Sequence, residues 1–295
     1  MEWNLDAPTA RSRGAVAAVV LAAVVAAVAA VRSLRTDAET DRARLLDAAA
    51  ARPERTFDPD DVADLPAPVR RYFETVLDEG QPHSRTVRLE QRGQFRVGDA
   101  NSDWKPLEAT QRVTVDPPGF VWDATVRLAP FVPVRVVDAY VEGEGSLRAR
   151  LLSVLTVADA DPSPELDAGE LQRYLAEAVW YPTALLPGAG VRWDSIDERS
   201  ARATLEHEDT TVSLVFEFDD ENLVERVVAD DRPRAVDDGF EPTRWTGRFW
   251  DYRERNGVLV PTVAEVEWNL PEGDLPYWRA TISDFEHRPA ASERR

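Results

Sequence analysis

The stretch that decides the fold class is WTGRFWDYRERNGVLVPTVAEVEW, residues 245–268. On each side of its central turn, polar and apolar side chains alternate, and a period of two is that of a β-strand. The turn holds Asn256 and Gly257, a pair that adopts the positive φ angles of a two-residue hairpin turn. This stretch therefore predicts two antiparallel strands, Trp245–Glu254 and Val258–Trp268, joined by a tight hairpin.

The same alternation continues on both sides of this hairpin. It is cleanest in residues 211–218, where every second side chain is large and apolar. Further strands are predicted at residues 85–97, in a run that ends at Val115, and at 120–128, 134–141, 146–157, 191–196, 201–207, 223–229 and 277–285. Short strands joined by hairpin turns predict a mainly β (α+β) fold: a large curved antiparallel meander or half-barrel.

Two segments interrupt the strands with helical spacing. Residues 66–79 place Val69, Tyr72, Phe73 and Val76 on one face. In residues 167–180, Asp167 and Glu170 have the spacing of a capping box. That segment also carries one apolar stripe, formed by Leu171, Tyr174, Leu175, Ala178 and Val179. We expect both helices to pack against the sheet.

Residues 14–31, GAVAAVVLAAVVAAVAAV, contain no polar side chain. Eighteen residues of helix are about 27 Å long, close to the hydrocarbon thickness of a bilayer. The run predicts an uncleaved transmembrane anchor rather than a cleaved secretory signal, whose apolar core is shorter. Arginines flank both ends, so the positive-inside rule leaves the orientation open. The expected location is the cell membrane, by a single pass, with the side of the soluble domain undecided.

This anchor divides the chain. We expect an N-terminal tail at 1–13, the anchor at 14–31, a helical stalk and linker at 32–64, an antiparallel β domain with helices at 65–286, and a polar tail at 287–295.

Acidic residues dominate the charge. The chain has 54 Asp and Glu against 35 Lys and Arg, a net charge of −19, and Lys105 is its one lysine. Such a surface is typical of a halophilic protein, although GC-rich coding also favours arginine and alanine. The charge argues against nucleic-acid binding, which needs basic patches. The absence of cysteine excludes disulfides and thiolate sites.

No motif predicts a metal site or a cofactor. His83, His207 and His287 lack the spacing of metal ligands. The acidic cluster Asp138, Glu142 and Glu144 lies around a predicted strand end, where alternate carboxylates share a face and meet for acid–base chemistry. A solvated acidic edge explains the same pattern, so whether the protein is an enzyme stays open.

Aromatic residues offer a second candidate site. Five residues surround the junction between the second helix and the next strand and are candidates to line a cavity for a hydrophobic ligand: Trp180, Tyr181, Leu185, Trp193 and Trp250. An ordinary core is the alternative. Arg173 and Glu177 have the spacing of a helical ion pair, and a buried arginine that binds a ligand carboxylate is the alternative there.

Three passages carry a resemblance. They are DPPGFVWDATVRLAPFVPVRVVDAYVEGEGSLRARLLS from Asp116, GELQRYLAEAVWYPTALLP from Gly169, and FWDYRERNGVLVPTVAEVEW from Phe249. Together they resemble an uncharacterised prokaryotic family, a domain of unknown function, over residues 65–286. The layout is also similar to that of the lipoprotein-carrier half-barrels, which implies a curved sheet around an apolar cavity but no catalytic residues.

The leading functional hypothesis is a membrane-anchored domain that binds a hydrophobic ligand such as a lipid or acyl chain. The alternatives are a non-catalytic interaction module tethered to the membrane and, third, an enzyme that uses the acidic cluster. The expected partners are the bilayer, through residues 14–31, and either a hydrophobic small molecule or a membrane protein; nucleic acid is not expected.

Overall fold

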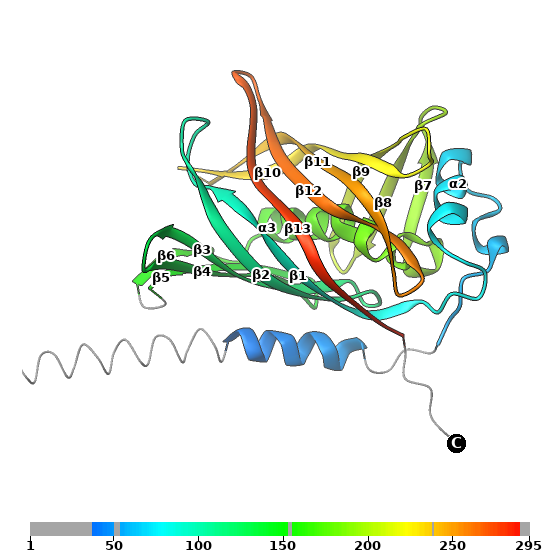
Figure 1. The fold of residues 1–295 in the computed structure, drawn as a ribbon, viewed down its shortest axis with the longest axis horizontal. Coiled ribbons are helices and arrows are strands. Elements are labelled where there is room, and N and C mark those ends of the chain that lie inside the picture. The colour runs from blue at the N-terminus through cyan, green and yellow to red at the C-terminus, as the bar shows by residue number, and fades with distance from the viewer. Residues whose placement is uncertain (1–36, 50–53, 153–154, 238, 290–295) are drawn as a thin grey trace, which may run out of the picture.

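One antiparallel sheet of 13 strands, curled into a half-barrel, forms the frame of the molecule (Figure 1). The computed structural model describes residues 37–49, 54–152, 155–237 and 239–289. The mainly β fold predicted from the two-residue period is confirmed.

The sheet consists of two meanders that are consecutive in the chain. The first holds β1 (Ser84–Arg96), β2 (Trp104–Thr114), β3 (Gly119–Ala129), β4 (Val132–Val141), β5 (Glu144–Leu151) and β6 (Leu155–Asp159). The second holds β7 (Val191–Ser195), β8 (Ser200–His207), β9 (Thr210–Phe218), β10 (Val224–Val236), β11 (Gly239–Arg255), β12 (Val258–Leu270) and β13 (Gly273–Pro289). Within each meander, neighbours in sequence are neighbours in the sheet.

The two meanders join through the strands that are farthest apart in sequence. β1 pairs with β13 in the middle of the sheet, so β6 and β7 become its two edges. The chain passes from one edge to the other through α3 (Pro164–Glu177), which lies inside the curl of the sheet (Figure 1). This crossing is what places charged side chains of α3 against the inner face.

The hairpin that decides the fold class has the predicted turn. Asn256 and Gly257 adopt φ angles of 52° and 76°, and Arg255 pairs with Val258. Further along the same strand pair, Asp251 also has a positive φ, of 56°. This conformation interrupts the alternation, so the Tyr252 hydroxyl points inward and donates to the carbonyl of Val224 at 2.8 Å.

Two sequence predictions need correction. Residues 146–157 form parts of two strands, β5 and β6, because the chain turns back after Leu151. The N-cap of α3 is Ser163, whose hydroxyl accepts from the Leu166 backbone N–H, so Asp167 and Glu170 do not form a capping box. Asp167 instead accepts from the Gly145 backbone N–H at 2.6 Å and ties α3 to β5.

Small helical elements cover one part of the inner face. They are α2 (Ala67–Val76), which buries the predicted apolar face, and the short 3-10 helices η1 (Pro59–Val62), η2 (Ala178–Trp180), η3 (Pro182–Leu185) and η4 (Pro187–Ala189). Beside β7–β9 this part is densely packed. The Trp193 ring meets the Phe216 ring edge-on, with 5.1 Å between the ring centroids, and the centroids of the Tyr72 and Phe218 rings are 5.7 Å apart. We call the core under β7–β9 the filled half.

Residues 37–49 are helical and lie against the outer face of the first meander (Figure 1). Ala38 and Leu45 are buried with Val121 and Val137 of the sheet, and Arg42 pairs with Asp123. The predicted anchor, residues 14–31, lies outside the described ranges. Within those ranges no helix is both long and apolar enough to cross a membrane.

A candidate ligand cavity with a charged base

A cavity of about 430 Å³ lies between α3 and the inner face of the sheet. Its wall comes from both meanders and is mostly apolar. The large side chains of the wall are Phe95, Trp122, Trp180, Trp245, Phe249 and Trp278. The cavity reaches the surface near Val97 and Val157, which also line it and are 57% and 61% exposed. We call this part of the molecule the hollow half.

Five charged residues also line the cavity, and we call them the charged base. They are Asp138 of β4, Glu170, Arg173 and Glu177 of α3, and Arg232 of β10. The three α3 residues follow one another at helical spacing on the face opposite the apolar stripe. Because sheet surrounds α3, the helix buries both faces, and its charged face meets the cavity instead of solvent.

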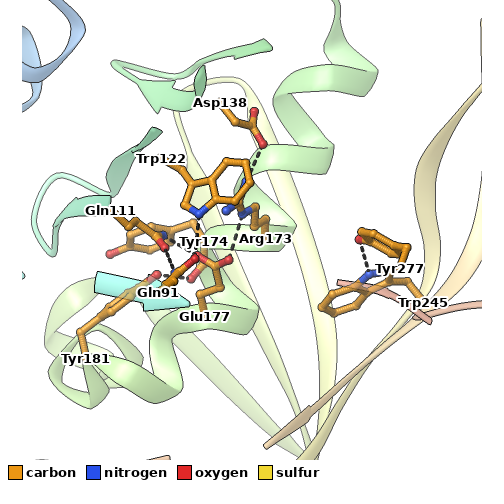
Figure 2. A network of polar contacts seen from close by, with 10 residues as sticks. All are labelled: Gln91, Gln111, Trp122, Asp138, Arg173, Tyr174, Glu177, Tyr181, Trp245 and Tyr277. Atoms are coloured by element: carbon orange, nitrogen blue, oxygen red, sulfur yellow. Dashed lines mark hydrogen bonds and ion pairs between the residues drawn. The ribbon is translucent and has the colours of Figure 1, made fainter. Parts of the chain in front are cut away.

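Arg173 holds the charged base together (Figure 2). Its guanidinium pairs with Asp138 and donates from Nε to Glu177 at 2.9 Å. The same group lies over the rings of Phe120 and Trp122, 4.8 and 4.9 Å from their centroids. Planar stacking together with two carboxylate partners is the environment in which a buried arginine is best satisfied.

A chain of amide side chains fixes Glu177 from the other side (Figure 2). The Trp122 indole N–H donates to Gln91 at 2.8 Å, Gln91 donates to Gln111 at 2.8 Å, and Gln111 donates to Glu177 at 2.5 Å. Gln91, Gln111 and Trp122 are buried and each has a partner, which makes the network rigid. The carboxylate of Glu177 is thereby committed to structural contacts.

The rest of the charged base lacks partners. Asp138 Oδ1, Glu170 Oε2 and Arg232 Nη1 are buried without a hydrogen bond among the described residues, and so is the indole Nε1 of Trp180 beside them. The Arg232 guanidinium lies 5.1 Å from the Trp245 ring, and the Trp245 N–H is already bonded to the Tyr277 hydroxyl at 2.9 Å (Figure 2). A buried polar atom without a hydrogen-bond partner lowers the stability of the folded state. These four atoms therefore lower the stability of the protein unless something else bonds to them.

Burial sets the protonation of the acids. It raises the pKa of Glu170 to about 8, helped by the nearby charge of Asp138, and it also raises the pKa of Asp138. Burial alone would lower the pKa of Arg173, but the carboxylates of Glu177 and Asp138 outweigh it and raise that pKa. At pH 7 Glu170 is therefore mostly neutral.

The five aromatic and apolar candidates from the sequence do not form one site. Trp180 lines the cavity. Tyr181, Leu185 and Trp193 belong instead to the core, where Trp193 donates to the Leu185 carbonyl at 2.9 Å. Trp250 is 44% exposed on the outer face, because strand alternation points it away from Phe249. Proximity to the helix–strand junction did not distinguish inward from outward side chains.

The predicted acidic cluster is also divided. Asp138 is buried at the cavity, whereas Glu142 occupies the turn after β4 with a φ of 53° and pairs with Arg44. Glu144 is exposed. Within the described ranges, no group of three or more His, Cys, Asp and Glu residues is arranged to hold a metal.

Sequence reasoning missed Arg232 and misassigned Glu170. One signal was present for Asp138: it follows an apolar run and precedes Ala139 and Tyr140, and residues 137–141 of this strand are all buried. A charged residue at an inward position of such a strand indicates a buried charge pair. The partner, Arg173, lies on a helix 35 residues away, which no local pattern specifies.

Comparisons with known proteins identify relatives but no activity. A model described as "Family of unknown function (DUF6920)" matches residues 63–287. Comparison with curated proteins gives no match. The predicted resemblance to a domain of unknown function is confirmed.

Among solved structures, the chain is similar to a LolA superfamily protein from Nitrosomonas europaea, with 11% identity, a TM-score of 0.34, and coverage of 77% of this chain and 94% of that one. It is also similar to a porin-like protein from Bacteroides uniformis, with 9% identity, a TM-score of 0.25, and coverage of 69% and 96%. A LolA superfamily protein is thus among the solved structures to which the chain is similar.

Proposed function

The chain belongs to the family of unknown function DUF6920, and we propose that its β domain binds a hydrophobic ligand, such as a lipid or an acyl chain, in the cavity of the hollow half. One observation carries the proposal: a mostly apolar space of about 430 Å³ stays open in a domain whose other half is tightly packed. Ligand sites typically enclose roughly 300–1,000 Å³ and combine apolar walls with a few polar groups.

Exposed apolar side chains at the mouth support this proposal. Besides Val97 and Val157, the tips of the hairpins β3–β4 and β5–β6 expose Phe131, Leu152 and Leu155. Phe131 is 96% exposed. Exposed apolar residues that gather at one edge mark interaction sites, and here they lie where a hydrophobic ligand enters.

The test is the ligand that the full chain retains. The protein is extracted into an amphipathic polymer without detergent, and its bound small molecules are measured by mass spectrometry. Ala149 lines the cavity, so Ala149→Phe fills part of it and should remove most of the retained lipid. Arg150→Phe, on the other face of β5, is the matched control and should retain it. Equal retention by both variants would contradict the proposal.

We further propose that residues 14–31 anchor the domain to a membrane, where apolar ligands are concentrated. The chain has no cysteine, so single-cysteine variants report its topology. Ala100→Cys lies in the exposed β1–β2 loop, and Asp6→Cys precedes the apolar run. In intact cells a membrane-impermeant maleimide should label one of the two variants only. Labelling of both, or extraction of the protein by carbonate, would contradict a membrane-spanning anchor.

The alternative of a tethered interaction module predicts a filled core, which suits the filled half but leaves the cavity without a role. The third hypothesis, an enzyme, rested on three carboxylates that the fold separates. Hydrophobic ligand binding is therefore the function that the geometry supports best.

A further inference from the structure

The four unpartnered atoms point to the polar end of the ligand. Two are hydrogen-bond donors, the Arg232 Nη1 and the Trp180 Nε1, and two are carboxyl oxygens, Asp138 Oδ1 and Glu170 Oε2. All four residues are more than nine-tenths buried and line the same cavity. A purely apolar ligand would leave every one of these atoms without a partner.

We propose that the cavity takes its ligand polar end first, and that the ligand is a long-chain amphiphile whose uncharged head, a hydroxyl or a primary amide, both donates and accepts hydrogen bonds at the charged base. This inference rests on the proposed function, because it concerns the same cavity. The apolar chain then runs along the wall toward Val97 and Val157, where the cavity meets the surface.

The mixture of donors and carboxyl groups in the base selects an uncharged head. Arg173 is committed to Asp138 and Glu177, while Arg232 has no carboxylate within ion-pair distance among the described residues. The unpartnered atoms of the cavity include both donors and carboxyl oxygens. A carboxylate head would be buried against the carboxyl groups of Asp138 and Glu170, and an ammonium head would be buried against the Arg232 guanidinium.

The hydrogen-bonding capacity of the head follows from the same four atoms. The oxygen of a hydroxyl or amide accepts from Arg232 and Trp180, and its hydrogen is donated to Asp138 or Glu170. Alcohols and amides carry both functions on adjacent atoms. The Trp245 indole, which already has Tyr277 as its acceptor, does not take part.

A competition among ligands of one chain length tests the inference. The full chain in an amphipathic polymer is equilibrated with equal amounts of dodecanol, dodecanamide, dodecanoate, dodecylamine and dodecane, and the retained molecules are extracted and quantified. We expect the alcohol and the amide to be retained at least about tenfold over the other three, the ratio that one or two buried hydrogen bonds supply.

Two pairs of variants locate the head. Trp180→Phe removes the free indole donor and should lower the ratio of dodecanol to dodecane about five- to tenfold. Trp250→Phe, at an exposed position outside the cavity, is the matched control and should leave this ratio unchanged. Arg232→Met should lower the ratio as well, and Arg248→Met, whose guanidinium pairs with Glu267 outside the cavity, should not. Because each ratio is internal to one sample, partial unfolding of a variant does not change it.

The outcomes separate this inference from the proposed function. Equal retention of all five compounds, lost in Ala149→Phe, would overturn the inference and leave the hydrophobic-ligand site standing. Preference for dodecanoate or dodecylamine would overturn it as well. Retention of none of the five above the level of Ala149→Phe would overturn both.

Discussion

The filled half and the hollow half are built from the same kind of strand, but only the filled half has an interior that side chains fill completely. Under β7–β9, large side chains meet directly, as Trp193 meets Phe216. Under β3–β6 and β10–β13, equally large side chains surround an open volume. The difference lies in what covers each half: α2, η3 and η4 lie under one, whereas the charged face of α3 and Trp180 of η2 meet the cavity of the other. In this molecule, a polar helix face is what keeps space open inside an apolar sheet.

The sharpest test of this difference compares two phenylalanines. Phe216→Ala in the filled half should lower the free energy of unfolding by about 3–5 kcal/mol, because a fully packed ring is replaced by a void. Phe249→Ala, at the cavity wall, should cost only about 2 kcal/mol, because its ring already lacks partner atoms on one side. Urea denaturation of both variants measures this. Equal losses would mean that the two halves are packed alike.

The ionisation of Glu170, in the hollow half, should make the stability of the protein depend on pH. Its pKa is about 8 in the folded chain and 4.5 ordinarily, so the folded state binds more protons and stability falls as pH rises between these values. From pH 6.5 to 8.5 the loss should be about 2 kcal/mol. Glu170→Gln should remove most of it in urea melts at the two pH values.

Burial of His287 gives the opposite dependence. Its pKa is lowered to about 4, so it costs stability only as pH falls below about 6.5. The window from pH 6.5 to 8.5 therefore isolates the acids of the charged base. An unchanged pH slope in Glu170→Gln would show that Glu170 is ionised in the folded protein.

Replacing an alanine by phenylalanine in each half tests the same difference by adding volume instead of removing it. Ala203, fully buried beside Trp193, has no room for a larger side chain, so Ala203→Phe should cost about 1–3 kcal/mol through overpacking. Ala149→Phe should cost less than about 1 kcal/mol, because the cavity accepts the ring. Thermal melts of the two variants give the difference. A larger loss in Ala149→Phe would show that the cavity wall is rigidly fitted.

The smallest effect concerns the helix at residues 37–49, which backs only the hollow half. Arg44 and Glu142 pair across this contact, but both side chains are more than two-fifths exposed. Arg44→Gln should therefore change the free energy of unfolding by less than about 0.5 kcal/mol. A loss above 1 kcal/mol in a urea melt at moderate salt would show that this ion pair, rather than buried Leu45, holds the helix to the sheet.

Much of the frame follows from local patterns. The two-residue period located most strands, and the pair Asn256-Gly257 correctly predicted the turn between β11 and β12. The end of β5 was missed because residues 151–157 are mostly apolar and contain no Gly or Pro to signal a turn. β10 and β11 run past their predicted ends because alternation is weak in the acidic stretch around Asp237. Local signals thus identify elements better than they place element ends.

The site depended on contacts that no local pattern contains. Trp180 was predicted, but Arg173, Asp138 and Arg232 meet only because α3 crosses from one sheet edge to the other. The capping-box spacing of Asp167 and Glu170 arose by chance in an acidic chain, and tertiary contacts use both residues elsewhere. The pairing of β1 with β13 likewise has no counterpart in the sequence pattern.

That central pairing has a consequence for how the chain is made. A ribosome delivers β1 almost two hundred residues before its partner, since Arg88 pairs with Glu286. Until β13 emerges, the first meander has an open edge at β1 that is able to pair with another nascent chain. Contacts this distant in sequence also form slowly. The protein therefore completes the middle of its sheet last, and loss of its final strand opens the sheet at its centre rather than at its rim.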